Sequence, residues 1–150
     1  MDNEGRRKYL SEWLGSNGKG TWVASTFNCN YGKNIFLSLN ITIDFNITIL
    51  DIRKVTIGDH TMIGLGILIT SVGHLLSPKG RREHEAFANP VNMGKDVFIG
   101  GNIVILPAIT IGQGSVIGPG SVVNKDITVF NFAVGSPARV IKKIVNDLEE

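Results

Sequence analysis

The apolar residues of this 150-residue chain recur every six positions over most of its length. Between Met93 and Val123 an aliphatic residue or methionine returns at each sixth position, and glycine follows four of these six. A helix repeats its apolar face every 3.6 residues and a strand every two, so neither element alone has this period. A short strand followed by a corner has a period of six residues. Three such units are expected to make one triangular turn of a parallel β-helix, an all-β fold.

The same phase predicts about four coils, whose strands stack on those of the preceding coil at roughly 4.8 Å. The alternative is a glycine-rich β-sandwich, but sandwich strands alternate at period two and do not hold a six-residue phase. The expected inward positions are Leu37, Ile43 and Ile49; Ile57, Ile63 and Ile69; Met93, Ile99 and Ile105; and Ile111, Ile117 and Val123.

The apolar phase breaks over residues 74–92 and then resumes, which predicts a loop that leaves the coil and returns in register. Long ordered loops in compact domains usually carry function. We therefore expect one domain over residues 1–150, with its β-helix at 21–127.

Both ends of the chain predict helices. Residues 3–15 place apolar side chains on one helical face and end at Gly15, so a short helix and linker are expected over residues 1–20. Pro137 can open a helix, and Val140, Ile141 and Ile144 follow at helical spacing. The segment 128–150 is therefore predicted to end in a helix that caps the coil.

Composition narrows the class of protein only slightly. The net charge of +2 does not indicate a nucleic-acid partner. Cys29 is the only cysteine, which excludes an internal disulfide and fits a reducing compartment. The sequence has no apolar run of about 18 residues that would span a membrane, and its first residues lack the apolar core of a signal peptide. A cytoplasmic protein is the expectation.

His74 stands where the coil gives way to the loop, and its imidazole could act as a general base near neutral pH. An ordinary surface histidine is the alternative. Glu85, in the same loop, could orient the imidazole or be a solvated carboxylate. The histidines at 60, 74 and 84 show no metal-ligand spacing, so no metal is expected.

Several stretches resemble the hexapeptide-repeat acyltransferases, and most closely the maltose, galactoside and nodulation-protein-L O-acetyltransferases. These stretches fall within a span of about 110 residues: NYGKNI (30–35), ILD (49–51), VTIGDHTMIG (55–64), SVGH (71–74), FIGGNIVILPAITIGQGSVIGPGSVVNKDI (98–127) and VGSPARVIKKI (134–144). The resemblance implies a left-handed β-helix and a homotrimer with active sites between subunits. It also implies acetyl-CoA as the donor and a hydroxyl of a sugar or other small molecule as the acceptor.

Individual residues match the motifs of that family. His74 matches its catalytic base, which takes the proton of the acceptor as the acceptor attacks the thioester, without a covalent enzyme intermediate. On the acceptor side we expect Asp44, Asn30 and Arg81. The positions that match the CoA contacts of the family are Gly101, Pro119, Asn124, Lys125, Arg139 and Lys142.

The departures from the family pattern fall mostly on the acceptor side. Asp44 replaces a common asparagine that helps to hold the acceptor and the developing oxyanion, and a carboxylate there would repel an oxyanion. Ile52 replaces an acid of the galactoside enzymes, Phe98 a tryptophan, and Pro119 an alanine. Three functions therefore stay open: O-acetyl transfer, N-acetyl transfer to an amine that pairs with Asp44, and a non-catalytic trimeric β-helix.

Overall fold

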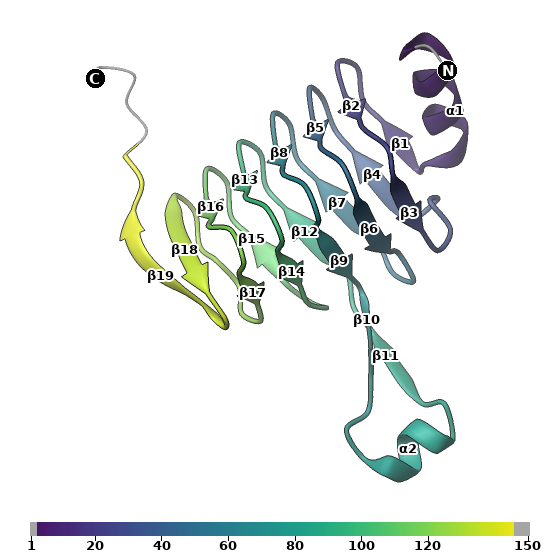
Figure 1. The fold of residues 1–150 in the computed structure, drawn as a ribbon, viewed down its shortest axis with the longest axis vertical. Coiled ribbons are helices and arrows are strands. Elements are labelled where there is room, and N and C mark those ends of the chain that lie inside the picture. The colour runs from purple at the N-terminus through teal and green to yellow at the C-terminus, as the bar shows by residue number, and fades with distance from the viewer. Residues whose placement is uncertain (1–2, 146–150) are drawn as a thin grey trace.

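The computed structural model describes residues 3–145, and it confirms a left-handed parallel β-helix with three sheets as its sides (Figure 1). Sheet A contains β1 (Ser16–Asn17), β4 (Ile35–Leu37), β7 (Val55–Ile57), β12 (Val91–Met93) and β15 (Thr110–Ile111). Sheet B contains β2 (Trp22–Val23), β5 (Thr42–Ile43), β8 (Met62–Ile63), β13 (Phe98–Ile99), β16 (Val116–Ile117), β18 (Asn131–Gly135) and β19 (Ala138–Lys143). Sheet C contains β3 (Phe27–Cys29), β6 (Ile47–Leu50), β9 (Leu68–Thr70), β14 (Val104–Ile105) and β17 (Val122–Val123).

The predicted inward residues form the core. All twelve are at most 4% exposed, and matching residues of successive turns are register partners, as Ile43, Ile63, Ile99 and Ile117 are along sheet B. Burying one such side chain contributes about 1.5–3 kcal/mol, so this column supplies much of the free energy that closes the coil.

The corners explain the glycines and the polar residues of the repeat. At Gly58 an added Cβ would lie 2.5 Å from the carbonyl carbon of Gly94 in the next turn, so these glycines permit close stacking. A separate column of residues with positive φ turns the chain between sheets A and B. Its members are Gly20, Asn40, His60, Asp96, Gly114 and Phe130. His60 is therefore a turn residue.

The prediction of about four coils was too low, because the chain makes about six turns. The missed first turn is β1, β2 and β3, which pair in parallel with β4, β5 and β6. Its inward positions are Asn17, Val23 and Cys29, which keep the six-residue spacing, although only Val23 is aliphatic. A partial sixth turn contains Ile127, which bridges to Ile111, and β18.

The predicted C-terminal helix is wrong over residues 138–143, which form β19. This strand pairs antiparallel with β18, and Val140 and Ile141 are 49% and 59% exposed rather than packed on the coil. The physical reason is the open edge of β18: a pairing strand satisfies its backbone groups, which a helix would not. Residues 146–150, the rest of the predicted helix, lie outside the described residues.

Two further elements leave the three sheets. The helix α1 (Asn3–Trp13) covers the N-terminal end of the coil, as predicted, and Leu14 after it is buried. The predicted loop is a hairpin of β10 (Val72–His74) and β11 (Ala86–Ala88) that carries α2 (Pro78–Arg82) at its tip and projects from the coil (Figure 1). Within residues 3–145, neither helix has the length and apolar character needed to cross a bilayer.

Candidate functional site

The predicted site residues lie on two different edges of the triangular coil. We call the corners where sheet B passes into sheet C the BC edge, and those where sheet C passes into sheet A the CA edge. Asn30, His74, Asn124 and Lys125 follow strands of sheet C and lie on the CA edge. Asp44, Gly101 and Pro119 follow strands of sheet B and lie on the BC edge.

His74 is the last residue of β10, so it lies at the outer end of the paired strands of the hairpin, and its side chain is exposed. The ring of Phe87 lies across Gly73, where an added Cβ would meet the ring at 2.4 Å. Ser71, which is fully buried, fixes the start of the hairpin: its hydroxyl donates to the carbonyl of Leu50 at 2.7 Å and accepts from the amide of Arg53 at 2.8 Å. The His74 imidazole is therefore exposed to solvent on a hairpin whose first residues are anchored to the coil by Ser71.

Glu85 does not touch His74 in this structure. The hairpin register places Ala86 directly opposite His74. Within residues 3–145, no hydrogen bond or ion pair joins the Glu85 carboxylate to the imidazole. Arg81 is exposed on α2, near the tip of the hairpin, so it also lies apart from His74. The hairpin therefore carries one candidate base at the outer end of its paired strands and one candidate cation on α2 at its tip.

Asp51 organises the loop that carries Asn30. Its carboxylate is fully buried and accepts hydrogen bonds from the backbone amides of Asn30 at 3.0 Å, Tyr31 at 2.9 Å and Asn34 at 3.3 Å. The Asn34 side chain donates in turn to the Asp51 carbonyl at 2.8 Å. A carboxylate with several amide donors can stay buried, because these bonds replace its hydration.

Asp44 stands at the BC edge of the second turn, half-buried, and its Oδ1 accepts a hydrogen bond from the amide of Phe45 at 2.8 Å. Gly101 and Pro119 occupy the same corner in turns four and five. The amide of Gly120 donates to the Gly101 carbonyl at 2.9 Å, so these two corners stack directly. An added Cβ at Gly101 would make ordinary van der Waals contact with Leu65 of the previous turn, whose carbonyl oxygen would lie 3.6 Å away.

The predicted phosphate-binding cations gather at the C-terminal end of the coil. Arg139, on β19, donates from Nη1 to the Asn124 side chain at 3.4 Å, which links the final hairpin to the CA edge beside Lys125. Lys142 lies farther along β19, with Nζ 6.0 Å from the ring centre of Phe132. Lys142 therefore lies over sheet B, away from the other three.

One chain cannot bring the two edges together. They are separated by the width of sheet C, which is roughly 15 Å for a side of four to five extended residues. Their order along the coil is nevertheless regular: Asp44 in turn two, His74 at turn three, Gly101 in turn four and Pro119 in turn five. In a single chain the predicted site residues on these edges therefore form two separate groups.

The outer face of sheet B carries an apolar stripe beside the BC edge. Trp22, Met62 and Phe98 occupy register-matched positions, with Thr42 between Trp22 and Met62, and are 42%, 54% and 44% exposed. At the BC edge itself, Phe45 and Leu65 are 53% and 48% exposed. Exposed apolar rows of this kind mark surfaces that other molecules cover.

Sequence reasoning missed the role of Asp51 and the existence of a cavity under α1, described below. Asp51 carries a readable signal, because an acid directly after the strand Ile47–Leu50 needs partners when it is buried. Among the described residues, no group of three or more His, Cys, Asp or Glu side chains is placed to hold a metal ion.

Comparison with known proteins gives consistent matches. Residues 90–125 match the family model described as bacterial transferase hexapeptide (six repeats). The chain is 38% identical over 147 residues to the galactoside O-acetyltransferase of Escherichia coli (strain K12), covering 98% of this chain and 72% of the relative. It is 43% identical over 132 residues to nodulation protein L of Rhizobium meliloti (strain 1021), covering 88% and 72%.

A solved structure matches over almost the whole chain. The hexapeptide-repeat acetyltransferase of Vibrio cholerae O1 biovar eltor, complexed with acetyl coenzyme A, superposes with a TM-score of 0.93 at 33% identity. The match covers 97% of this chain and 80% of that one.

Cys29 supplies a test of the local electrostatics beside Asp51. Burial, and then the Asp51 carboxylate, raise the pKa of the Cys29 thiol from 9.0 to about 11. Two pKa units lower the thiolate fraction about a hundredfold at pH 8, so iodoacetamide should alkylate the folded protein about a hundredfold more slowly than the urea-unfolded chain. Because the folded pKa is raised, the associated stability is present below pH 9 and is lost as pH rises through 11. Equal alkylation rates, followed by mass spectrometry, would contradict this assignment.

Proposed function

Since this chain belongs to the hexapeptide-repeat acetyltransferase family of galactoside O-acetyltransferase and nodulation protein L, we propose that it transfers the acetyl group of acetyl-CoA to a hydroxyl of a small acceptor, with His74 as general base. The family membership makes it an acyltransferase. The observation that carries the finer proposal is the exposed His74, which stands at a level of the coil between the acceptor candidate Asp44 and the donor candidates Gly101 and Pro119.

The active protein is a homotrimer whose sites form between neighbouring chains. In this arrangement the CA edge of one chain faces the BC edge of the next, and closed three-fold packing gives three equivalent sites. Two observations support it: the predicted site residues fall on two edges that one chain cannot join, and the apolar stripe of Trp22, Met62 and Phe98 lies beside one of those edges. Covering this stripe supplies a hydrophobic driving force for association.

Acetyl-CoA binds in the groove between chains, along turns four to six of the coil. Lys125 and Arg139 meet its phosphates, because guanidinium and ammonium groups are the usual partners of phosphate oxygens. Asn124 adds to this end, and the pantetheine arm passes Pro119 and Gly101 toward His74; Lys142, over sheet B, remains a predicted contact.

The reaction is a direct displacement. The acceptor oxygen attacks the thioester carbon while a ring nitrogen of His74 takes the hydroxyl proton. The carbon–sulfur bond then breaks, and the CoA thiolate recovers that proton from the imidazolium, so the products are the acetyl ester and free CoA thiol. Glu85 remains the predicted group that orients the imidazole, and Asn30 and Arg81 remain predicted acceptor contacts.

Asp44 favours one second candidate, N-acetyl transfer to an amine. A carboxylate repels a developing oxyanion, so Asp44 is better suited to contact the acceptor than to stabilise the thioester oxygen. If the acceptor carries an ammonium group, the same carboxylate would pair with it.

The base is tested by His74→Ala, which we expect to lower turnover by roughly a hundredfold or more because it removes the proton acceptor. The measurement is thiol release from acetyl-CoA with a panel of sugars, amino sugars and simple alcohols. His60→Asn and His84→Asn are matched controls, because both histidines have positive φ, which asparagine tolerates. Unchanged turnover in His74→Ala would remove His74 from this role.

The shared site is tested by mixing two inactive chains. His74→Ala lacks the base, and Asp44→Arg fills the acceptor side of the BC edge with a long cation. Each should be inactive alone, whereas trimers co-expressed from equal amounts should regain about a quarter of wild-type activity, because half of the chains supply each intact edge. Light scattering should give the mass of a trimer for every sample. Mixed trimers as inactive as their parents would place the whole site within one chain.

The acceptor class is tested with methyl galactoside and an amino sugar of the same ring size. We expect faster transfer to the hydroxyl acceptor. Asp44→Asn should leave or raise that rate, because it removes a charge that repels the oxyanion. Faster transfer to the amine, lost in Asp44→Asn, would instead establish N-acetyl transfer.

A further inference from the structure

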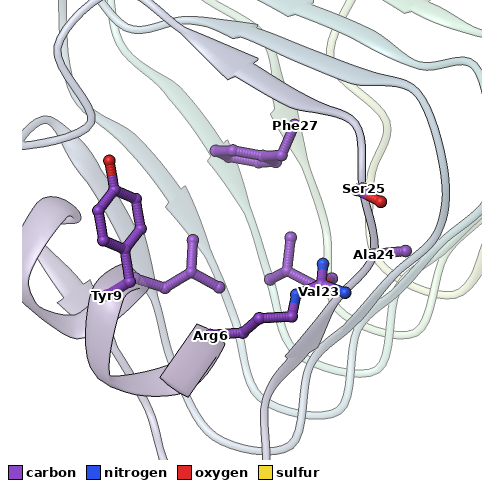
Figure 2. A pocket seen from close by; sticks show the side chains of 7 residues that line it. Arg6, Tyr9, Val23, Ala24, Ser25 and Phe27 are labelled. Carbon is purple, nitrogen blue, oxygen red and sulfur yellow. The ribbon is translucent and has the colours of Figure 1, made fainter. Parts of the chain in front are cut away.

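A cavity of about 140 Å³ lies between α1 and the first turn of the coil (Figure 2). The helix contributes Arg6, Tyr9 and Leu10 to its wall. The first turn contributes the segment Val23–Ser25 and Phe27. The cavity is therefore lined by one chain alone and needs no neighbouring copy to form.

The cavity wall is mainly apolar and is held in place. Val23 is 4% exposed, and Leu10 and Phe27 are half-buried. Trp13 supports Phe27 from behind in an edge-to-face contact with 6.2 Å between ring centres. The guanidinium of Arg6 donates to the Val23 carbonyl, which fixes a positive charge in this wall and ties α1 to the first turn.

The cavity adjoins the BC edge one turn below Asp44. The amide of Ala24, a wall residue, donates to the carbonyl of Ile43 at 2.9 Å, so Ala24 stacks beside Asp44. Farther around the corner, the Thr26 hydroxyl bonds the Asn46 side chain at 3.0 Å. Successive turns are roughly 4.8 Å apart, so the cavity wall and the Asp44 carboxylate lie within the length of one small molecule.

We propose that this cavity receives an apolar substituent of the acceptor while the acceptor's reacting group lies at Asp44. The inference rests on the proposed function and deepens it. In order along the coil, the cavity is at turn one, Asp44 at turn two, His74 at turn three and the donor contacts at turns four to six. A substituted acceptor lies along the same line, with its apolar end farthest from acetyl-CoA.

Size and charge define the substituent. A cavity of about this volume, lined by aliphatic and aromatic side chains, is large enough to hold a benzene ring. The fixed Arg6 guanidinium repels a cationic group, so the substituent is a neutral ring or a branched alkyl group of about six carbons. The acceptor is therefore a hydroxylated molecule with an apolar tail, rather than a free sugar.

The experiment compares phenyl galactoside with methyl galactoside, which share the sugar and differ in the substituent. Calorimetric titration of the wild-type protein should show about tenfold tighter binding of the phenyl compound, as expected for partial burial of one ring. Leu10→Phe and Ser25→Phe each place a ring into the cavity from a different wall and should abolish this preference. Leu39→Phe is the matched control, because Leu39 is 48% exposed at the corner between sheets A and B, away from the cavity.

The outcomes separate the cavity from the enzyme activity. Equal binding of the two galactosides, or no binding of the phenyl compound at millimolar concentration, overturns the proposal. A preference that survives both filling variants, with unchanged thermal unfolding, also overturns it. Thiol release is measured in parallel. A preference for the phenyl compound without acetyl transfer rejects the proposed function but supports binding of the substituent in the cavity. Acetyl transfer with equal KM for both compounds supports the proposed function but rejects the role of the cavity.

Discussion

The narrow core of the coil is the constraint on which the rest of this structure depends. Each turn must place one residue inward from each of three sheets, and in turns two to five all twelve of these residues are aliphatic or methionine and nearly inaccessible. Interiors this closely packed tolerate little change in volume, so the inward positions fix the register of every strand. Once register is fixed, the position of each corner residue along the coil follows from the sequence. A linear site can therefore be built by substituting corners, which face outward and leave the core unchanged.

The sequence predicted the regular turns because six-residue spacing and aliphatic character coincide there. The prediction failed where the six-residue spacing and the aliphatic character do not occur together. In the first turn Asn17 occupies an inward position, and its Oδ1 is buried without a hydrogen-bond partner among the described residues, so the hydrophobic signal is lost although the backbone pairing persists. At the other end, Val140 and Ile141 fit a helical face, but the open edge of β18 offers a full set of backbone hydrogen bonds. The spacing of apolar residues within one segment does not reveal that a neighbouring strand has an unpaired edge.

The site was predictable to a similar extent. His74 could be found because the apolar phase breaks beside it, and the resemblance to a known family assigned its expected role. The division between two edges depends on three-dimensional position, although the coil makes it regular: residues after sheet B reach one edge and residues after sheet C the other. Asp51 was overlooked as a structural residue because its importance comes from three backbone amides that approach from the previous turn. A single-sequence pattern does not reveal these donors.

The order of turns separates the two substrates of the proposed reaction. The predicted donor contacts occupy turns four to six, where Arg139 ties the last hairpin to Asn124. Of the predicted acceptor contacts, Asn30 and Asp44 lie in turns one and two, near the cavity between α1 and the irregular first turn, whereas Arg81 lies on the projecting hairpin. Since neighbouring turns interact mainly with each other, changes at the first turns leave the distant donor turns intact. Asp44 and the α1 cavity are therefore the places where this chain can adopt a different acceptor while keeping the same donor chemistry at His74.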